Sequence, residues 1–196
     1  MIRNVPLAVL CIAATLAAAS CAGRRDAARA PDFLGDTPML RPAADDPAAR
    51  VWFDPAVDFT QYSRLLIDPV EVVLVPGADA ASLDPALLAG LAAEFRATLV
   101  RVVDPYYDVL DAPAPRTLRI RAALTDARLR PGGRSSADLV DARVEWMALD
   151  AMTGRRVGAG IRRRESRPDA PGFDPWAFAL LDVMDCRQVL GAGAPR

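Results

Sequence analysis

Two neighbouring segments of this chain alternate between apolar and polar residues, and they constrain the fold more than any other feature. They are "TLRIRAALTDARL" (residues 117–129) and "LVDARVEWMALD" (residues 139–150). A period of two is that of a strand with one buried face and one solvated face, which is typical of antiparallel sheets. We therefore expect both segments to be strands, joined by the loop at residues 130–137. The side chains expected to point inward are those of Leu118, Ile120, Ala122, Leu124, Val140, Ala142, Val144, Trp146 and Ala148.

A hairpin turn follows the second segment. The sequence "DAMTG" (residues 150–154) starts with Asp150 and ends with Gly154, which suits a position of positive φ. We assign both residues to a structural turn. The alternation then continues through Val157, Ala159 and Ile161, and we expect these side chains to point inward on the return strand. Arg162 and Arg164 are therefore predicted to point to water.

Helical spacing appears in two places. Asp84-Pro85 looks like an N-cap followed by proline in the first turn, and apolar residues recur at helical spacing from there to about Val103. A second helix is predicted to begin near Asp174-Pro175, with a stripe that carries Cys186 as an inert core thiol. Residues 64–75 predict a strand at an edge or bulged at Pro69, and residues 106–110 a short one. The fold class expected is α+β: a two-layer sandwich, with a mostly antiparallel sheet and both helices packed on one face.

The first twenty residues have the pattern of an export signal. Arg3 precedes an uncharged, Ala/Leu-rich run, which could be cut after Ala19, be kept as a membrane anchor, or end in a lipobox. The sequence Ala18-Ala19-Ser20-Cys21 favours the lipobox, although Ala18 stands where leucine is usual. We predict a lipoprotein signal peptide at residues 1–20 and lipidation at Cys21, with acyl chains that hold the protein to a membrane. Residues 21–50 are predicted to be a tether, and residues 51–196 a single α/β domain.

The composition excludes several kinds of site. The chain has no histidine, and all 24 of its basic residues are arginine. Catalytic triads and zinc sites that use His are therefore excluded, as are P-loops and Schiff bases, which need Lys. The formal net charge of −1 does not suggest nucleic-acid binding. We expect no metal, no cofactor and no catalytic residues.

Five arginines form the candidate contact surface: Arg119, Arg121, Arg143, Arg162 and Arg164. One interpretation is a sheet face that binds an anionic lipid or glycan. The other is a solvated face on which the arginines pair with acidic residues such as Asp141 and Glu145 across the strands.

Other candidates have simpler explanations. A hydrolase that uses only Asp and Glu would need two carboxylates facing each other across a cleft. Asp45, Asp46, Asp182 and Asp185 are the residues considered for that role. We expect Asp126 to close its strand through backbone hydrogen bonds. The Gly132-Gly133 pair is a weak phosphate-binding signal.

Several segments resemble a family of bacterial lipoproteins called domain of unknown function 3313. They are "PDFLGDTPML", "VDFTQYSRLLIDPVEV", "LRIRAALTDARL", "ALDAMTGRRVGAG" and "WAFALLDVM", in this order. The resemblance covers about residues 33–190. It implies a small α/β envelope lipoprotein and no catalytic residues.

The predicted function is a non-catalytic interaction or accessory module in the periplasm with an envelope protein as partner. A non-Asp residue after the lipidated cysteine, here Ala22, usually implies delivery to the outer membrane in lipoproteins of this kind. The alternatives are the anion-binding module and the Asp/Glu-dependent hydrolase.

Overall fold

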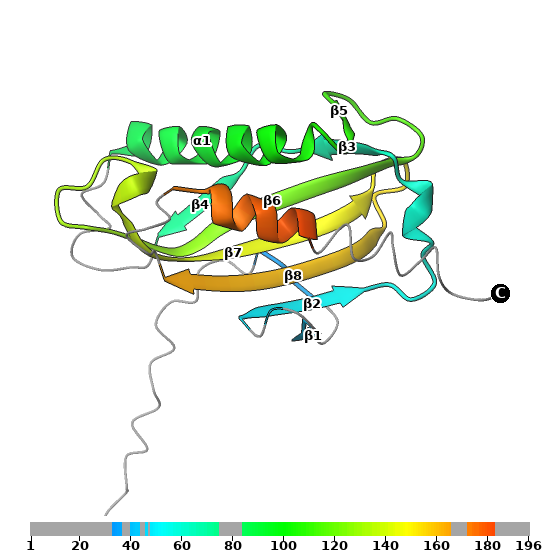
Figure 1. Ribbon diagram of the computed structural model, residues 1–196, viewed down its shortest axis with the longest axis horizontal. Coiled ribbons are helices and arrows are strands. Elements are labelled where there is room, and N and C mark those ends of the chain that lie inside the picture. The colour runs from blue at the N-terminus through cyan, green and yellow to red at the C-terminus, as the bar shows by residue number, and fades with distance from the viewer. Residues whose placement is uncertain are drawn as a thin grey trace, which may run out of the picture.

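The structure is a computed structural model that describes residues 33–36, 40–43, 46, 48–74, 84–165 and 172–182 (Figure 1). The predicted signal peptide, Cys21 and Cys186 lie outside the described residues.

The described residues form a mixed α/β fold around an open sheet of eight strands (Figure 1). The strands are β1 (Arg41–Pro42), β2 (Ala49–Phe53), β3 (Arg64–Ile67), β4 (Glu71–Leu74), β5 (Asp108–Leu110), β6 (Thr117–Leu129), β7 (Leu139–Asp150) and β8 (Arg156–Glu165). Their order is β1-β2-β8-β7-β6-β3-β5, and β4 also pairs with β6. The predicted mixture of helices with a mostly antiparallel sheet is confirmed.

Part of the sheet is parallel, which the sequence pattern did not predict. Strands β3 and β4 run parallel to β6, and β5 runs parallel to β3. The single strand predicted over residues 64–75 is two strands, because Pro69 lacks the N–H that a continuous ladder needs. These two strands pair with successive parts of β6: Ile67 lies opposite Ile120, and Glu71 lies opposite Ala123.

Helix α1 (Pro85–Val103) begins where its cap predicts. The carboxylate of Asp84 accepts a hydrogen bond from the backbone N–H of Ala86 at 2.9 Å, and Pro85 occupies the first turn. A second helix spans 174–182, and short 3-10 helices lie at η1 (Phe59–Gln61) and η3 (Ser136–Asp138). Buried residues of both longer helices share one core with one face of the sheet, here called the helix-side face.

Three bulges change which side chains point toward the helix-side face of the sheet. In β7, Val140 is the extra residue between two paired positions, so its side chain is 45% exposed, and the inward orientation predicted for it is wrong. In β6, Asp126 adopts φ 54° at a bulge and the strand continues to Leu129, so Asp126 does not close it. In β8, Val157 is the extra residue.

The bulge at Val157 shifts the alternation of β8 by one residue. Val157 is buried on the helix-side face as predicted, but Ala159 belongs to a second apolar cluster on the opposite face, here called the outer face. Leu34, Met147 and Ala159 are buried in that cluster, and Phe33, Leu40, Trp52, Leu149 and Ile161 pack around them. Residues of the predicted tether thus cover part of the sheet, and the boundary proposed at residue 50 falls inside β2.

Candidate functional site

The structure places the side chains of four of the five predicted arginines, and these four are divided between two faces. Arg119 and Arg121 of β6 lie on the outer face with Arg143 of β7, and Arg163 lies opposite Arg143. Arg162 is in register with Val144 on the helix-side face, so its predicted place on the outer face is wrong. The cause is the bulge at Val157, since one inserted residue reverses every later side chain.

Arg162 is held by the chain itself. Its guanidinium pairs with the carboxylate of Asp46 and donates to the backbone carbonyl of Pro175 at 3.4 Å. The backbone of Arg164 is in register with Ala142, and its side chain is outside the described part of the structure. Of the predicted contact surface, the structure places Arg119, Arg121 and Arg143 on the outer face, and the part of the prediction that concerns Arg164 stays a prediction.

Arg119 and Arg121 converge on acidic residues that follow β3 or begin β4. The Nε of Arg119 donates to Oδ1 of Asp68 at 2.9 Å, and its Nη2 lies 2.9 Å from Oδ2. This hydrogen bond, together with the charge of Asp68, raises the pKa of Arg119. Arg121 donates to Glu71 at 3.2 Å and lies 3.9 Å from Asp68.

A second group of ion pairs surrounds Asp141. Arg163 and Arg128 both donate to its Oδ2, at 2.8 and 3.1 Å. Burial is the largest single influence on the pKa of Asp141 and raises it, but the two arginines together outweigh burial and hold the pKa below its usual value. The other carboxylate oxygen, Oδ1, is buried without a hydrogen-bond partner among the described residues.

A third group joins the bulge of β6 to β7. Arg143 lies 2.9 Å from Asp126 and 3.7 Å from Glu145. The hydroxyl of Thr125 donates to Glu145 at 2.9 Å in a buried contact. The buried carboxylate of Glu145 therefore has both a charged partner, Arg143, and a hydrogen-bond donor, Thr125.

These contacts make up the outer-face network, which contains five arginines and five acidic residues. Its members are Arg119, Arg121, Arg128, Arg143 and Arg163 with Asp68, Glu71, Asp126, Asp141 and Glu145. Each guanidinium faces a carboxylate, so formal charges cancel across the surface. This geometry matches the interpretation of a solvated, internally paired face rather than one that offers unpaired positive charge to an anion.

Sequence reasoning missed four of the ten members of this network. Asp68 and Glu71 lie about fifty positions before the arginines that they bind, and no local pattern joins them. Arg128 and Arg163 could have been found from the strand pairing, had the bulges been known.

The predicted turn links the end of the sheet to the core. Oδ1 of Asp150 accepts from the backbone N–H of Thr153 at 2.8 Å, and Gly154 adopts φ 70°. The Tyr62 hydroxyl donates to Oδ2 of Asp150 at 3.0 Å. Burial, then the hydrogen bond and the charge of Asp150, raise the pKa of Tyr62 to about 12. The Asp150 carboxylate and the Tyr62 hydroxyl thus both make hydrogen bonds that stabilise the fold.

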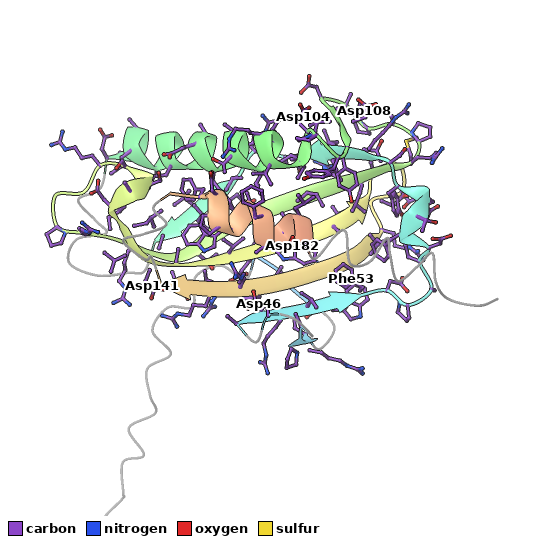
Figure 2. The ribbon with its side chains drawn as sticks, viewed as in Figure 1. Asp46, Phe53, Asp104, Asp108, Asp141 and Asp182 are labelled. Carbon is purple, nitrogen blue, oxygen red and sulfur yellow. The ribbon has the colours of Figure 1, made fainter. Side chains whose placement is uncertain are left out.

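The aspartates considered for hydrolysis and the loop at Gly132-Gly133 supply no site in the described residues. Asp46 is bound to Arg162, and Asp182 lies exposed on the helix at 174–182 (Figure 2), while Asp45 and Asp185 lie outside the described residues. In the loop after Gly133, the backbone N–H groups of Arg134 and Ser135 both donate to the carboxylate of Asp138. The chain's own carboxylate therefore fills the position that a phosphate would take.

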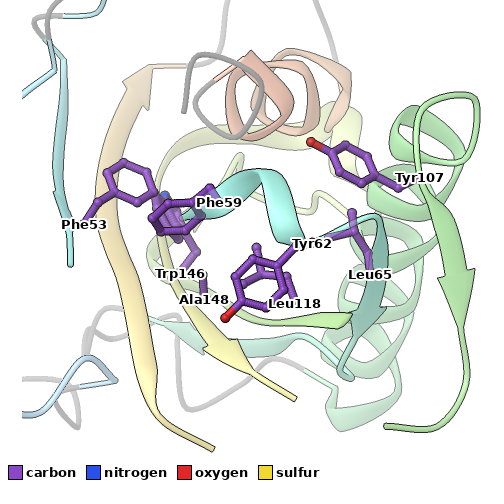
Figure 3. A pocket seen from close by; sticks show the side chains of 8 residues that line it. All are labelled: Phe53, Phe59, Tyr62, Leu65, Tyr107, Leu118, Trp146 and Ala148. Atoms are coloured by element: carbon purple, nitrogen blue, oxygen red, sulfur yellow. The ribbon is translucent and has the colours of Figure 1, made fainter. Parts of the chain in front are cut away.

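A small apolar cavity lies at the end of the core (Figure 3). Its volume is about 10 Å³, close to the room of one water molecule. It is lined by Phe53, Phe59, Tyr62, Leu65, Tyr107, Leu118, Trp146 and Ala148. A cavity of this size and lining is a gap between packed aromatic rings and has no room for an organic ligand.

The described residues contain no group of three or more His, Cys, Asp or Glu placed to hold a metal ion. Within the same part of the chain, no helix is long and apolar enough to cross a membrane.

Solved structures with distant similarity to this chain include the following two proteins. The PelC dodecamer from Paraburkholderia phytofirmans is 15% identical, with 71% of this chain and 95% of that chain covered and a TM-score of 0.43. The lipoprotein GNA1162 from Neisseria meningitidis is 8% identical, with 63% and 95% covered and a TM-score of 0.35. No curated protein matches the sequence.

The family comparison confirms the resemblance seen in the sequence. Residues 29–179 match the family model described as "Protein of unknown function (DUF3313)", and the chain belongs to that family.

Proposed function

We propose that this protein is an envelope lipoprotein, anchored through Cys21 in the outer membrane and facing the periplasm. Its folded domain acts as a non-catalytic interaction or accessory module for an envelope protein. The observation that carries the proposal is the position of Cys21, which directly follows small residues at the end of an apolar export signal. Membership in a family of unknown function is compatible with this role.

The arrangement of the folded domain supports a role without turnover. A two-layer sandwich with both helices on one face is supported by the single core that both helices share with the sheet. The acidic residues of the outer-face network are engaged by arginines, and these ion pairs hold the carboxylates in fixed positions within the sheet surface. With no histidine in the chain, this leaves few groups suited to acid–base catalysis.

The anion-binding alternative has weaker support than the sequence alone suggested. A free guanidinium binds phosphate or carboxylate by two parallel hydrogen bonds. Arg119 already makes such a contact with Asp68, so an anion would have to displace a carboxylate. The hydrolase alternative gains no support from the two of its candidate carboxylates that are described, because Asp46 pairs with Arg162 and Asp182 lies exposed on a helix.

Metabolic labelling tests the anchor. Radiolabelled palmitate should enter the wild-type protein and be absent from the Cys21→Ala variant, and the labelled protein should fractionate with the outer membrane. An unlabelled mature chain that starts at Ser20 would show cutting by the ordinary signal peptidase and refute the proposal. Crosslinking in cells followed by identification of the crosslinked proteins then tests the partner.

A further inference from the structure

We infer that the outer face of the sheet lies against the membrane that holds the anchor and contacts its phospholipid headgroups, leaving the helix side free in the periplasm. This inference rests on the proposed anchoring at Cys21. It follows from the path of residues 33–36, here called the strap, across the outer face.

The strap crosses three strands. Arg156 at the start of β8 donates to the backbone carbonyl of Asp36 at 3.1 Å. Leu34 is 4% exposed and packs with Met147 of β7 and Ala159 of β8. The guanidinium of Arg121 on β6 lies 5.6 Å from the centre of the Phe33 ring, within the range of a cation–π contact.

Phe33 therefore lies over the interior of the sheet rather than at its edge, in contact with Arg121 of β6 and packed against the cluster of Met147 and Ala159. Strand β6 has β7 on one side and β3 and β4 on the other. Every route from Phe33 to the helix side must first pass at least one neighbouring strand.

The length of chain between Cys21 and Phe33 limits how else the domain could be oriented at the membrane. Twelve residue steps separate Cys21 from Phe33 in the sequence, and a chain of that length reaches at most about 40 Å. Passing one or two strands takes about 5–10 Å, and passing the sheet and a packed helix takes about 20 Å more. Turning the helix side to the membrane would thus use well over half of the greatest reach, and extension of a chain costs conformational freedom. With the outer face toward the membrane, no such detour is needed.

The chemistry of the outer face suits headgroups that carry both charges. The side chains of Arg119 and Arg121 are 42% and 41% exposed, and they stand beside Asp68 and Glu71. A zwitterionic headgroup carries both a phosphate and an ammonium, so it can lie beside the exposed side of an arginine–carboxylate pair without displacing the carboxylate. The contact therefore preserves the neutrality of the outer-face network.

The test uses the full lipoprotein, with Cys186→Ser, in vesicles of zwitterionic phospholipid that contain a fraction of lipid with a quencher on its headgroup. A fluorophore is attached in one variant at Arg50→Cys, an exposed position in register with Ile161 on the outer face. In the other variant it is attached at Ala93→Cys, an exposed position of α1. We expect several-fold more quenching at position 50 than at position 93.

Two changes should reduce that difference for separate reasons. Leu34→Asp releases the strap from its apolar cluster, and doubling the stretch between Cys21 and Phe33 with Gly and Ser lengthens the reach. Asp36→Asn is the matched control, because Asp36 is exposed and its contact with Arg156 uses the backbone carbonyl. Circular dichroism checks that each variant is folded, and the longer chain tests the inference even if Leu34→Asp does not fold.

The outcomes separate the two proposals. A chain that carries no acyl mass and does not float with vesicles overturns the anchoring and this inference with it. A chain that is acylated and floats, but shows equal quenching at both positions or more at position 93, overturns this inference alone. A difference that survives the longer chain unchanged also overturns it.

Discussion

Replacing Gly160 with alanine tests how tightly β8 packs against the aromatic core. A Cβ at this position would lie 2.6 Å from Cε2 and Cζ2 of Trp146 and 2.7 Å from its Nε1. Carbon atoms in contact normally lie about 3.5–4.0 Å apart, so the overlap is about 1 Å. Trp146 has little room to retreat, because it is 4% exposed and its ring centre lies 5.7 Å from that of Phe53.

The expected loss in the free energy of unfolding is about 2 kcal/mol. Overpacking in a core typically costs about 1–3 kcal/mol, and a contact this short belongs in the upper half of that range. The gain from restricting the unfolded chain offsets about 0.5–1 kcal/mol of it. Gly90→Ala is the matched control, since a Cβ there meets nothing within 4 Å in the middle of α1. That variant should gain about 0.8–1 kcal/mol.

Urea unfolding followed by circular dichroism measures both values, with an unchanged slope showing that only stability has changed. Trp146→Phe combined with Gly160→Ala completes a double-mutant cycle. If the ring contact is the cause, the cost of Gly160→Ala should fall when the smaller ring is present. A Gly160→Ala variant as stable as the wild type, or a cost that is independent of residue 146, would refute the packing argument.

Three further predictions concern polar contacts. The raised pKa of Tyr62 means that its stabilising effect is fully present below pH 10 and is lost as the pH rises toward about 12. The expected loss in the free energy of unfolding is about 2–3 kcal/mol, which denaturation measured at alkaline pH should detect. The Tyr62→Phe variant should not show this pH-dependent loss. Because the pKa of Asp141 is lowered, its contribution to stability is present at pH values above the usual carboxyl range and is lost as the pH falls. Asp141→Asn should lower the free energy of unfolding by about 1–3 kcal/mol at neutral pH. The difference in stability between this variant and the wild type should shrink on acidification. Asp84→Ala should cost about 1 kcal/mol through loss of the cap, measured by thermal unfolding, and no change would show that the cap does not stabilise α1.

The sequence by itself determined the elements whose signals are local. Asp84-Pro85 marks the start of α1 because a cap and a proline act within one turn. The turn from Asp150 to Gly154 is equally local, and the alternation of residues 118–124 gives the buried side of β6 because a strand has a period of two. The family could also be recognised from the sequence, since the quoted segments keep its order.

Only the tertiary structure decided which arginines share a face and what they bind. One extra residue at Val157 places Arg162 on the helix-side face and Arg163 on the outer face, and the bulge appears only when β8 is paired with β7. Asp68 meets Arg119 because β3 pairs in parallel with β6, a contact across 51 positions of the chain. Phe33 and Leu34 stand out as apolar residues in a segment with the composition of a tether, but only the fold shows that Leu34 is buried against Met147 and Ala159. Local periodicity fixes a strand, whereas register, bulges and distant partners follow from the free energy of the assembled sheet, which no short window of the sequence contains.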